Sequence, residues 1–209
     1  MAKKNEKRKN KTTPQSPELS GGTGFTFEDA VAASYLAALL AEAYAPGIPD
    51  HIVARVAVQQ RYFKQPLDDV IVDFINVSGA TARLSLQVKR ALTISAARSN
   101  TDFCDVIRDS WMTYRDPAFR PGIDRYGTAV GDIAKTKARD LVNLCKLARA
   151  STTINHFMAR FVKGGNASAA VKAIKSDISA LLQEAKGSAC SDEEIHGFLA
   201  NFVLGACRA

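Results

Sequence analysis

The chain has 209 residues, of which 46% are apolar and 23% charged, with 28 Lys and Arg against 21 Asp and Glu. This length and composition are typical of one ordinary globular domain. They exclude a wholly disordered chain, collagen and a disulfide-framed miniprotein. No run of about 18 uncharged apolar residues occurs, so we expect no membrane span and no membrane partner. The most apolar stretch, Ala30 to Ala45, is interrupted by Glu42 and predicts a buried helix.

The net charge of +7 is concentrated at the N-terminus. Residues 1–11 hold six basic residues and one acid, which gives +5; the other 198 residues hold 22 basic and 20 acidic residues, which gives +2. The composition of residues 1–24 predicts a disordered basic leader, with weak attraction to phosphates as the functional alternative. No apolar segment follows the basic run, so we expect no secretory signal.

The cysteines and histidines show no metal-ligand spacing. No CxxC pair occurs, so we expect free thiols in a reducing cytoplasm rather than a structural zinc site. These residues are Cys104, Cys145, Cys190, Cys207, His51, His156 and His196.

The first half of the chain predicts a helix followed by a small sheet. Residues 27–44 have a helical pattern whose apolar positions surround the helix, so we expect packing on several sides. Three segments predict strands, and the short connection between the last two predicts an antiparallel hairpin. The strands are expected at residues 52–63, 69–77 and 83–89.

The second half predicts mostly helices. An apolar stripe that includes Trp111, expected in the core, is followed by one more buried strand at residues 126–133. Ser191 and Glu194 have the spacing of a helix capping box. The expected helices lie near residues 136–150, 152–163, 168–185 and 191–203. We therefore expect an α/β (α+β) fold, with a small mixed sheet flanked by helices and a C-terminal helical extension at residues 135–209.

Polar side chains gather at one end of the predicted sheet. Glu28 lies in the first turn of the first helix, and Asp69 opens the second strand, with Asp68 as its alternative. Gln87 and Lys89 are two residues apart on the third strand, so they share a face. The hairpin brings the start of one strand to the end of the other, which places Asp69 beside Gln87 and Lys89. Glu28 joins them if the first helix packs on that face.

These side chains suit a hard divalent cation. The carboxylates of Asp69 and Glu28 and the amide oxygen of Gln87 are ligands for Mg²⁺, which Mn²⁺ can replace. A lysine such as Lys89 can orient or help deprotonate a water and stabilise the charge that develops on a phosphate. The set predicts metal-dependent hydrolysis of a phosphodiester.

The order of these residues resembles the PD-(D/E)xK nuclease superfamily, which has Glu on a first helix, Asp opening a strand and (D/E/Q)xK on the next. The QxK variant is also that of Mrr-like restriction enzymes. Over about residues 24–205 the chain resembles the dsDNA endonuclease effector domain of bacterial anti-phage proteins, both CD-NTase-associated endonucleases and STAND-type NTPases. The matching segments are GFTFEDAVAASYLAALL, PLDDVIVDF, LSLQVKRALTIS and FCDVIRDSWMTY.

The resemblance implies a restriction-endonuclease-like core at residues 25–134, with a site formed by Glu28, Asp69, Gln87 and Lys89. It implies double-stranded DNA as the substrate and the bacterial cytoplasm as the location. It also implies a homo-oligomer, or clustering through an NTPase or sensor module to which residues 135–209 link the core. The neutral amide of Gln87 is a departure, because the usual residue is acidic and metal binding must then depend on Asp69 and Glu28.

Other interpretations stay open. Arg90 and Arg83 could line a phosphate path or form an ordinary solvated edge. Each candidate residue taken alone has a structural explanation; Glu28, for example, would compensate a helix dipole. The alternative function is a non-catalytic DNA-binding or oligomerisation module of the same fold. A phosphate loop at residues 21–24 is rejected, because no strand precedes it and no GK[ST] follows.

Overall fold

The computed structural model describes residues 22–206 of the chain. Most of the expected basic leader, residues 1–21, lies outside the described residues, and so does Cys207. The helix begins at Gly22, before the end expected for the leader. Among residues 22–206, no helix has the length and apolarity needed to cross a bilayer.

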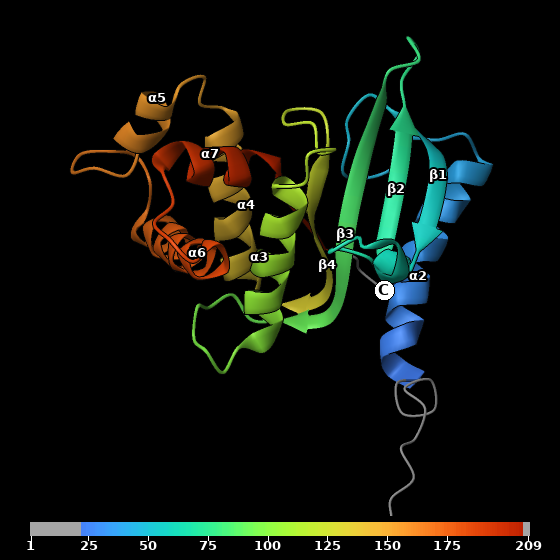
Figure 1. The fold of residues 1–209 in the computed structure, drawn as a ribbon, viewed down its shortest axis with the longest axis horizontal. Coiled ribbons are helices and arrows are strands. Elements are labelled where there is room, and N and C mark those ends of the chain that lie inside the picture. Colours follow the sequence, from blue (N-terminus) through green and yellow to red (C-terminus); the bar gives the residue numbers. More distant parts are fainter. Residues whose placement is uncertain (1–21, 207–209) are drawn as a thin grey trace, which may run out of the picture.

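A mixed five-stranded sheet forms the centre of the molecule (Figure 1). Its strands lie in chain order, with β1 and β2 antiparallel, β2 and β3 antiparallel, and β3, β4 and β5 parallel. The expected α/β class and the expected hairpin are therefore confirmed. The strands are β1 (Ile52–Val58), β2 (Val70–Ile75), β3 (Thr81–Leu92), β4 (Arg125–Ile133) and β5 (Phe202–Ala206).

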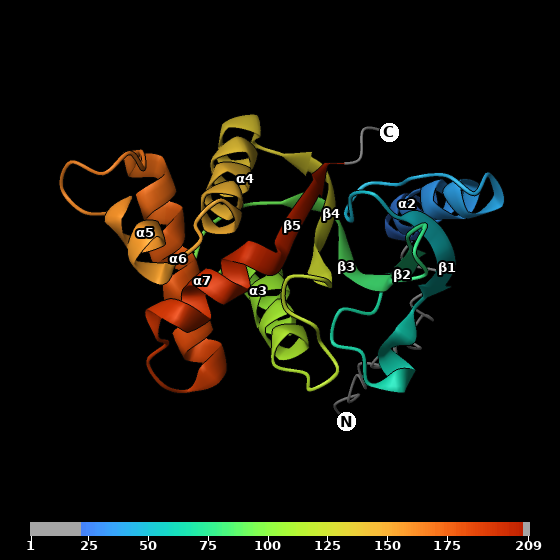
Figure 2. The same ribbon diagram turned by 90° about the horizontal axis from the view of Figure 1, so that it is seen from above.

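Within residues 22–206, six helices flank this sheet (Figure 2). Helix α2 lies over β1 to β3 on one face, and α3 lies on the other side, where it crosses from β3 to β4. Helices α4 to α7 form a block beside α3 and β5. The helices are α2 (Gly22–Leu40), α3 (Thr101–Tyr114), α4 (Lys135–Arg149), α5 (Ile154–Ala159), α6 (Ala169–Lys186) and α7 (Asp192–Asn201), with one 3-10 turn, η1 (Gln60–Phe63).

Alternation along β3 separates two hydrophobic cores. Leu84 and Leu86 face α2 and pack with Val31 and Tyr35 of that helix. On the other side, one large cluster joins Trp111 of α3 to β4 and to the C-terminal helices. Because side chains alternate along a strand, the polar residues of β3 lie on the face away from α2. Both the predicted alternation and the buried position of Trp111 are confirmed.

Three expected elements end at different residues. The first helix stops at Leu40 instead of continuing to Tyr44, because the chain turns there and Tyr44 forms a bridge with Ile52. The first strand stops at Val58, because Gln59 has a positive φ of 51° that a strand cannot continue. The helix expected at residues 152–163 is shorter, covering Ile154–Ala159.

The prediction of helix to residue 203 was wrong, because Phe202–Ala206 form strand β5. The segment FVLGA is wholly apolar and lies parallel to β4, where its backbone completes the sheet. A short apolar run of this kind does not reveal by itself whether it is a strand or a helix. Nη1 of Arg149 in α4 donates to the carbonyl of Phe202 at 3.0 Å and so satisfies one backbone group of the edge strand β5.

Candidate functional site

The candidate residues lie at the end of the sheet where three elements meet. The start of α2, the start of β2 and the end of β3 are all at the lower end of the view in Figure 1. Residues from separate parts of the sequence therefore reach one end of the molecule. The last regular pair there is Val70 with Leu86, so Asp69 and Gln87 are the next residues on the two strands.

Asp69 is fixed where β2 and β3 begin to separate. The N–H of Gln60 donates to the carbonyl of Asp68 at 2.8 Å, and the N–H of Gln59 donates to the carbonyl of Asp69 at 3.1 Å. Both carbonyls thus face the β1 side. On the β3 side, the carboxylate Oδ2 of Asp69 accepts the N–H of Val88 at 2.7 Å. This bond holds the carboxylate against the backbone between Gln87 and Lys89.

Glu28 reaches the same end from the other face of the sheet. The sequence predicts that Glu28 joins the other residues if α2 packs on the face of Gln87, whereas α2 packs on the opposite face, against Leu86. Burial raises the pKa of the Glu28 carboxyl, and the nearby negative charge of Asp69 raises this pKa further. The Nε2 of Gln59 lies 3.5 Å from Oε1 of Glu28 and acts in the opposite direction, lowering the pKa.

Gln87 is buried, with 7% of its surface exposed. Its Oε1 has no hydrogen-bond partner among the residues that the structure describes. A buried polar atom without a partner is unusual and destabilising, since it has lost its contacts with water. Asp68, the alternative to Asp69, is also buried, and its charge adds slightly to the raised pKa of Glu28.

Lys89 lies at the end of β3 and binds α3. Its Nζ donates to Oδ1 of Asp102 at 2.9 Å, and Asp102 lies in the first turn of α3. The side chain of Lys89 is 22% exposed and that of Asp102 is 58% exposed, so water has access to the pair. Among the described residues, the ion pair of Lys89 is with Asp102, and the structure does not bring its ammonium into contact with Glu28.

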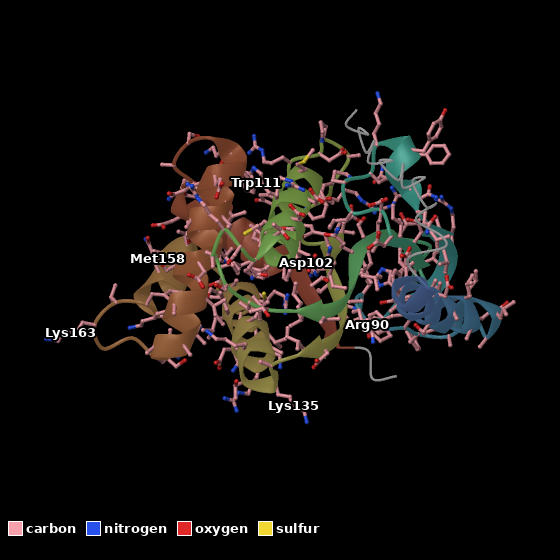
Figure 3. All side chains as sticks on the ribbon, turned by 90° about the horizontal axis from the view of Figure 1, so that it is seen from below. Arg90, Asp102, Trp111, Lys135, Met158 and Lys163 are labelled. Atoms are coloured by element: carbon pink, nitrogen blue, oxygen red, sulfur yellow. The ribbon has the colours of Figure 1, made fainter. Side chains whose placement is uncertain are left out.

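The two candidate phosphate-binding arginines occupy different places. Arg90 is exposed and follows Lys89 at the site end of β3 (Figure 3). Arg83 lies six residues before Lys89 on β3, which is about 20 Å from Lys89 in an extended strand. Its Nε donates to Oδ1 of Asp73 at 2.7 Å, and this bond raises the pKa of Arg83. Arg83 therefore belongs to a surface ion-pair network remote from Asp69.

The donor atoms fit a divalent cation, although the acidic residues alone do not form a cluster for one. Within residues 22–206, no three His, Cys, Asp or Glu side chains gather closely enough to hold a metal. The negative charge of Asp69 is close enough to raise the pKa of Glu28, and Gln87, next to Asp69 across β2 and β3, carries a buried amide oxygen without a partner among the described residues. A cation would relieve the repulsion between the carboxylates and provide a partner for Gln87 Oε1.

Two residues of this arrangement were missed from the sequence. Gln59 contacts Glu28, and Asp102 binds Lys89. Gln59 lay inside the segment interpreted as one long strand, and no sequence signal distinguished it. Asp102 precedes the apolar stripe of α3, and its position in the first turn of a helix that follows β3 was an available signal.

No protein-family model, no curated protein and no solved structure matches this chain.

Proposed function

We propose that this chain is a metal-dependent endonuclease of the PD-(D/E)xK type that hydrolyses phosphodiester bonds of double-stranded DNA. The proposal includes a role as the effector domain of an anti-phage defence system in the bacterial cytoplasm. The observation that carries it is the carboxylate of Asp69, bound to the backbone between Gln87 and Lys89 and close enough to Glu28 to raise its pKa. Three elements thus deliver the expected residue types to one end of the sheet.

Each residue has a defined role in the proposed reaction. Asp69, Glu28 and the amide oxygen of Gln87 would hold Mg²⁺ or Mn²⁺, which supplies Lewis-acid stabilisation of the phosphate when bound. Lys89 donates hydrogen bonds to the attacking water or to the phosphate oxygens. Asp102 is a positioning residue for this lysine, since it accepts a hydrogen bond from the ammonium.

Plasmid cleavage tests the proposal. We expect the wild-type chain to cut supercoiled plasmid in Mg²⁺ or Mn²⁺ and to be inactive in EDTA. Lys89→Ala should abolish cleavage with little change in Tm, because an ion pair this exposed contributes less than about 1 kcal/mol. Lys163→Ala is the matched control: this exposed lysine lies on a loop at the far end of the molecule (Figure 3) and should cut like wild type. Equal cutting by Lys89→Ala and wild type would refute the site.

The second candidate is a non-catalytic DNA-binding or oligomerisation module of the same fold. It is favoured by the ion pair between Lys89 and Asp102, which engages the lysine on α3, and by the neutral amide of Gln87. The two functions differ in EDTA. DNA binding that persists in EDTA, with no cleavage in Mg²⁺ or Mn²⁺, would favour this second function.

We also propose that clustering increases the activity. A helical block, α4 to α7, extends beyond the sheet, and the outer face of α2 exposes Leu36 and Leu40. Cleavage per chain should therefore rise with concentration and on fusion to a trimeric coiled coil. Activity per chain that is independent of both would contradict regulation by clustering without affecting the site.

A further inference from the structure

We propose that the turn η1 is a base-contacting element, in which the rings of Tyr62 and Phe63 stack on unpaired nucleobases beside the phosphate held at the Asp69 end. This inference rests on the proposed nuclease function and adds how the chain would grip its DNA. Three independent features of the turn support it: exposed aromatic rings, a strained backbone and a direct connection to the site.

The aromatic rings of η1 are unusually exposed. Tyr62 is 91% exposed and Phe63 is 66% exposed, and their ring centroids are 5.6 Å apart in an edge-to-face arrangement. By contrast, the rings of Phe74, Phe103 and Tyr126 are fully buried. Two adjacent exposed rings leave apolar area in water, and large exposed apolar groups that lie together mark binding surfaces.

The backbone on both sides of η1 is strained. Gln59 has φ of 51° and Lys64 has φ of 60°, and neither is glycine. An L-residue with a side chain seldom adopts this left-handed region, because its Cβ approaches the backbone. Backbone strain of this kind clusters at active sites and ligand-binding segments, so two strained positions around one short turn favour a binding role for it.

Hydrogen bonds join the residues at the start of η1 to the backbone of Asp68 and Asp69 and to the carboxylate of Glu28. The N–H groups of Gln59 and Gln60 bond to the carbonyls of Asp69 and Asp68, and the side chain of Gln59 contacts Glu28. In Figure 1 the turn lies at the foot of β2, and in Figure 2 it projects away from the sheet. The turn that carries the rings is therefore joined directly to the segment that carries Asp69.

Nucleobases are the occupant that these features favour. Every base has a flat face, so stacking on Tyr62 and Phe63 is tolerant of sequence and suits an enzyme with little preference. Lys64, exposed next to the rings, offers a cation to the adjoining phosphates. A purely apolar partner would leave the charge of Lys64 without a complement.

Binding in EDTA tests the inference separately from catalysis. Fluorescence anisotropy would be measured with a labelled 20-base-pair duplex and with its single strand. We expect the double variant Tyr62→Ala and Phe63→Ala to bind the single strand at least about tenfold more weakly than wild type, as stacking contributions predict. Tyr44→Ala is the matched control, since it removes an exposed ring at the other end of α2, and it should bind within twofold of wild type. A single strand carrying 2-aminopurine should lose fluorescence on binding wild type but not the double variant.

The outcomes separate the two proposals. Equal binding and equal 2-aminopurine quenching by wild type and the double variant would overturn the role of η1, and the nuclease function would stand if Lys89→Ala alone abolished cleavage. Weakening by Tyr44→Ala to the same extent as the double variant would also overturn it, since ring loss anywhere would then suffice. A wild-type chain that neither binds nor cuts DNA would overturn both proposals.

Discussion

At the residue scale, the site depends on how Asp69 and Gln87 are satisfied. Asp69 has a backbone donor at 2.7 Å, while the buried Oε1 of Gln87 has no partner among the described residues. The sequence order predicted that Asp69 would lie near the QxK pair, since strand register follows from the hairpin. It could not predict that Lys89 binds Asp102 or that Gln59 contacts Glu28, because both contacts depend on where α3 and the residue after β1 lie in space.

The variant Gln87→Glu should make the stability of the protein more dependent on metal. In EDTA we expect a loss of about 2 kcal/mol or more, because a carboxylate at this buried position, beside Asp69, lacks a counter-charge. In Mg²⁺ the added charge becomes a ligand, so the variant should gain more Tm per decade of Mg²⁺ than wild type. Thermal denaturation against Mg²⁺ concentration checks this. Equal gains in Tm for the variant and wild type would show that Gln87 does not contact the metal.

At the element scale, capping and sheet pairing decide where α7 ends and β5 begins. Ser191 and Glu194 form a full capping box at the start of α7, as their spacing predicted. The switch to β5 at Phe202 was not predictable from local pattern, since it depends on pairing with β4 and on Arg149. Local signals therefore determined the start of this helix, and tertiary contacts determined its end.

The variant Ser191→Ala should destabilise the protein by about 1 kcal/mol, because it leaves the N–H of Glu194 without its acceptor. Urea denaturation at neutral pH measures this loss. Ser179→Ala, which removes a hydroxyl bonded within helix α6, is a suitable comparison and should have a smaller effect. A loss for Ser191→Ala no larger than that of this comparison variant would contradict a structural role for the cap.

The charge of Glu194, at the start of α7, should make the stability of the fold depend on pH. The hydrogen bond from Lys186, and then the one from the Ser191 N–H, hold the pKa of the Glu194 carboxyl below its usual value. A lowered pKa stabilises the fold above the pKa of the unfolded chain, about 4.3, and this stability is lost as pH falls through the folded value. Glu194→Gln, which keeps an acceptor oxygen, should lower Tm slightly at pH 7 and not at pH 3. A Tm difference of the same size at both pH values would contradict this assignment.

At the scale of the whole molecule, the core expected at residues 25–134 shares its interior with the rest of the chain. One buried cluster joins Trp111 and Tyr126 to Leu144, Ile174 and Phe198 of the C-terminal helices. The sequence predicted these helices. It did not reveal that they complete the core, because periodicity shows which face is apolar and not which element covers it. The boundary at residue 134 stays a prediction.

Truncation after residue 134 should therefore prevent stable folding of residues 22–134. The cut removes β5 and exposes Trp111 and Tyr126, which are now almost wholly buried. Loss of this much apolar contact far exceeds the 5–15 kcal/mol, roughly, by which a domain of this size is stable. Near-UV circular dichroism and the cooperativity of urea denaturation check the result. A truncated chain that unfolds cooperatively and still cuts DNA would show that the core folds alone.

We propose that residues of α2, β2 and β3 together hold one divalent cation. Replacing Mg²⁺ with Fe²⁺ in the presence of ascorbate and peroxide generates hydroxyl radicals at the metal, which cut the nearest backbone. Mass spectrometry of the fragments should show cuts around Glu28, Asp69 and Gln87 to Lys89, and all three should disappear in Asp69→Asn. Cuts confined to other segments, or the same three cuts in wild type and Asp69→Asn, would contradict a metal held at this end of the sheet.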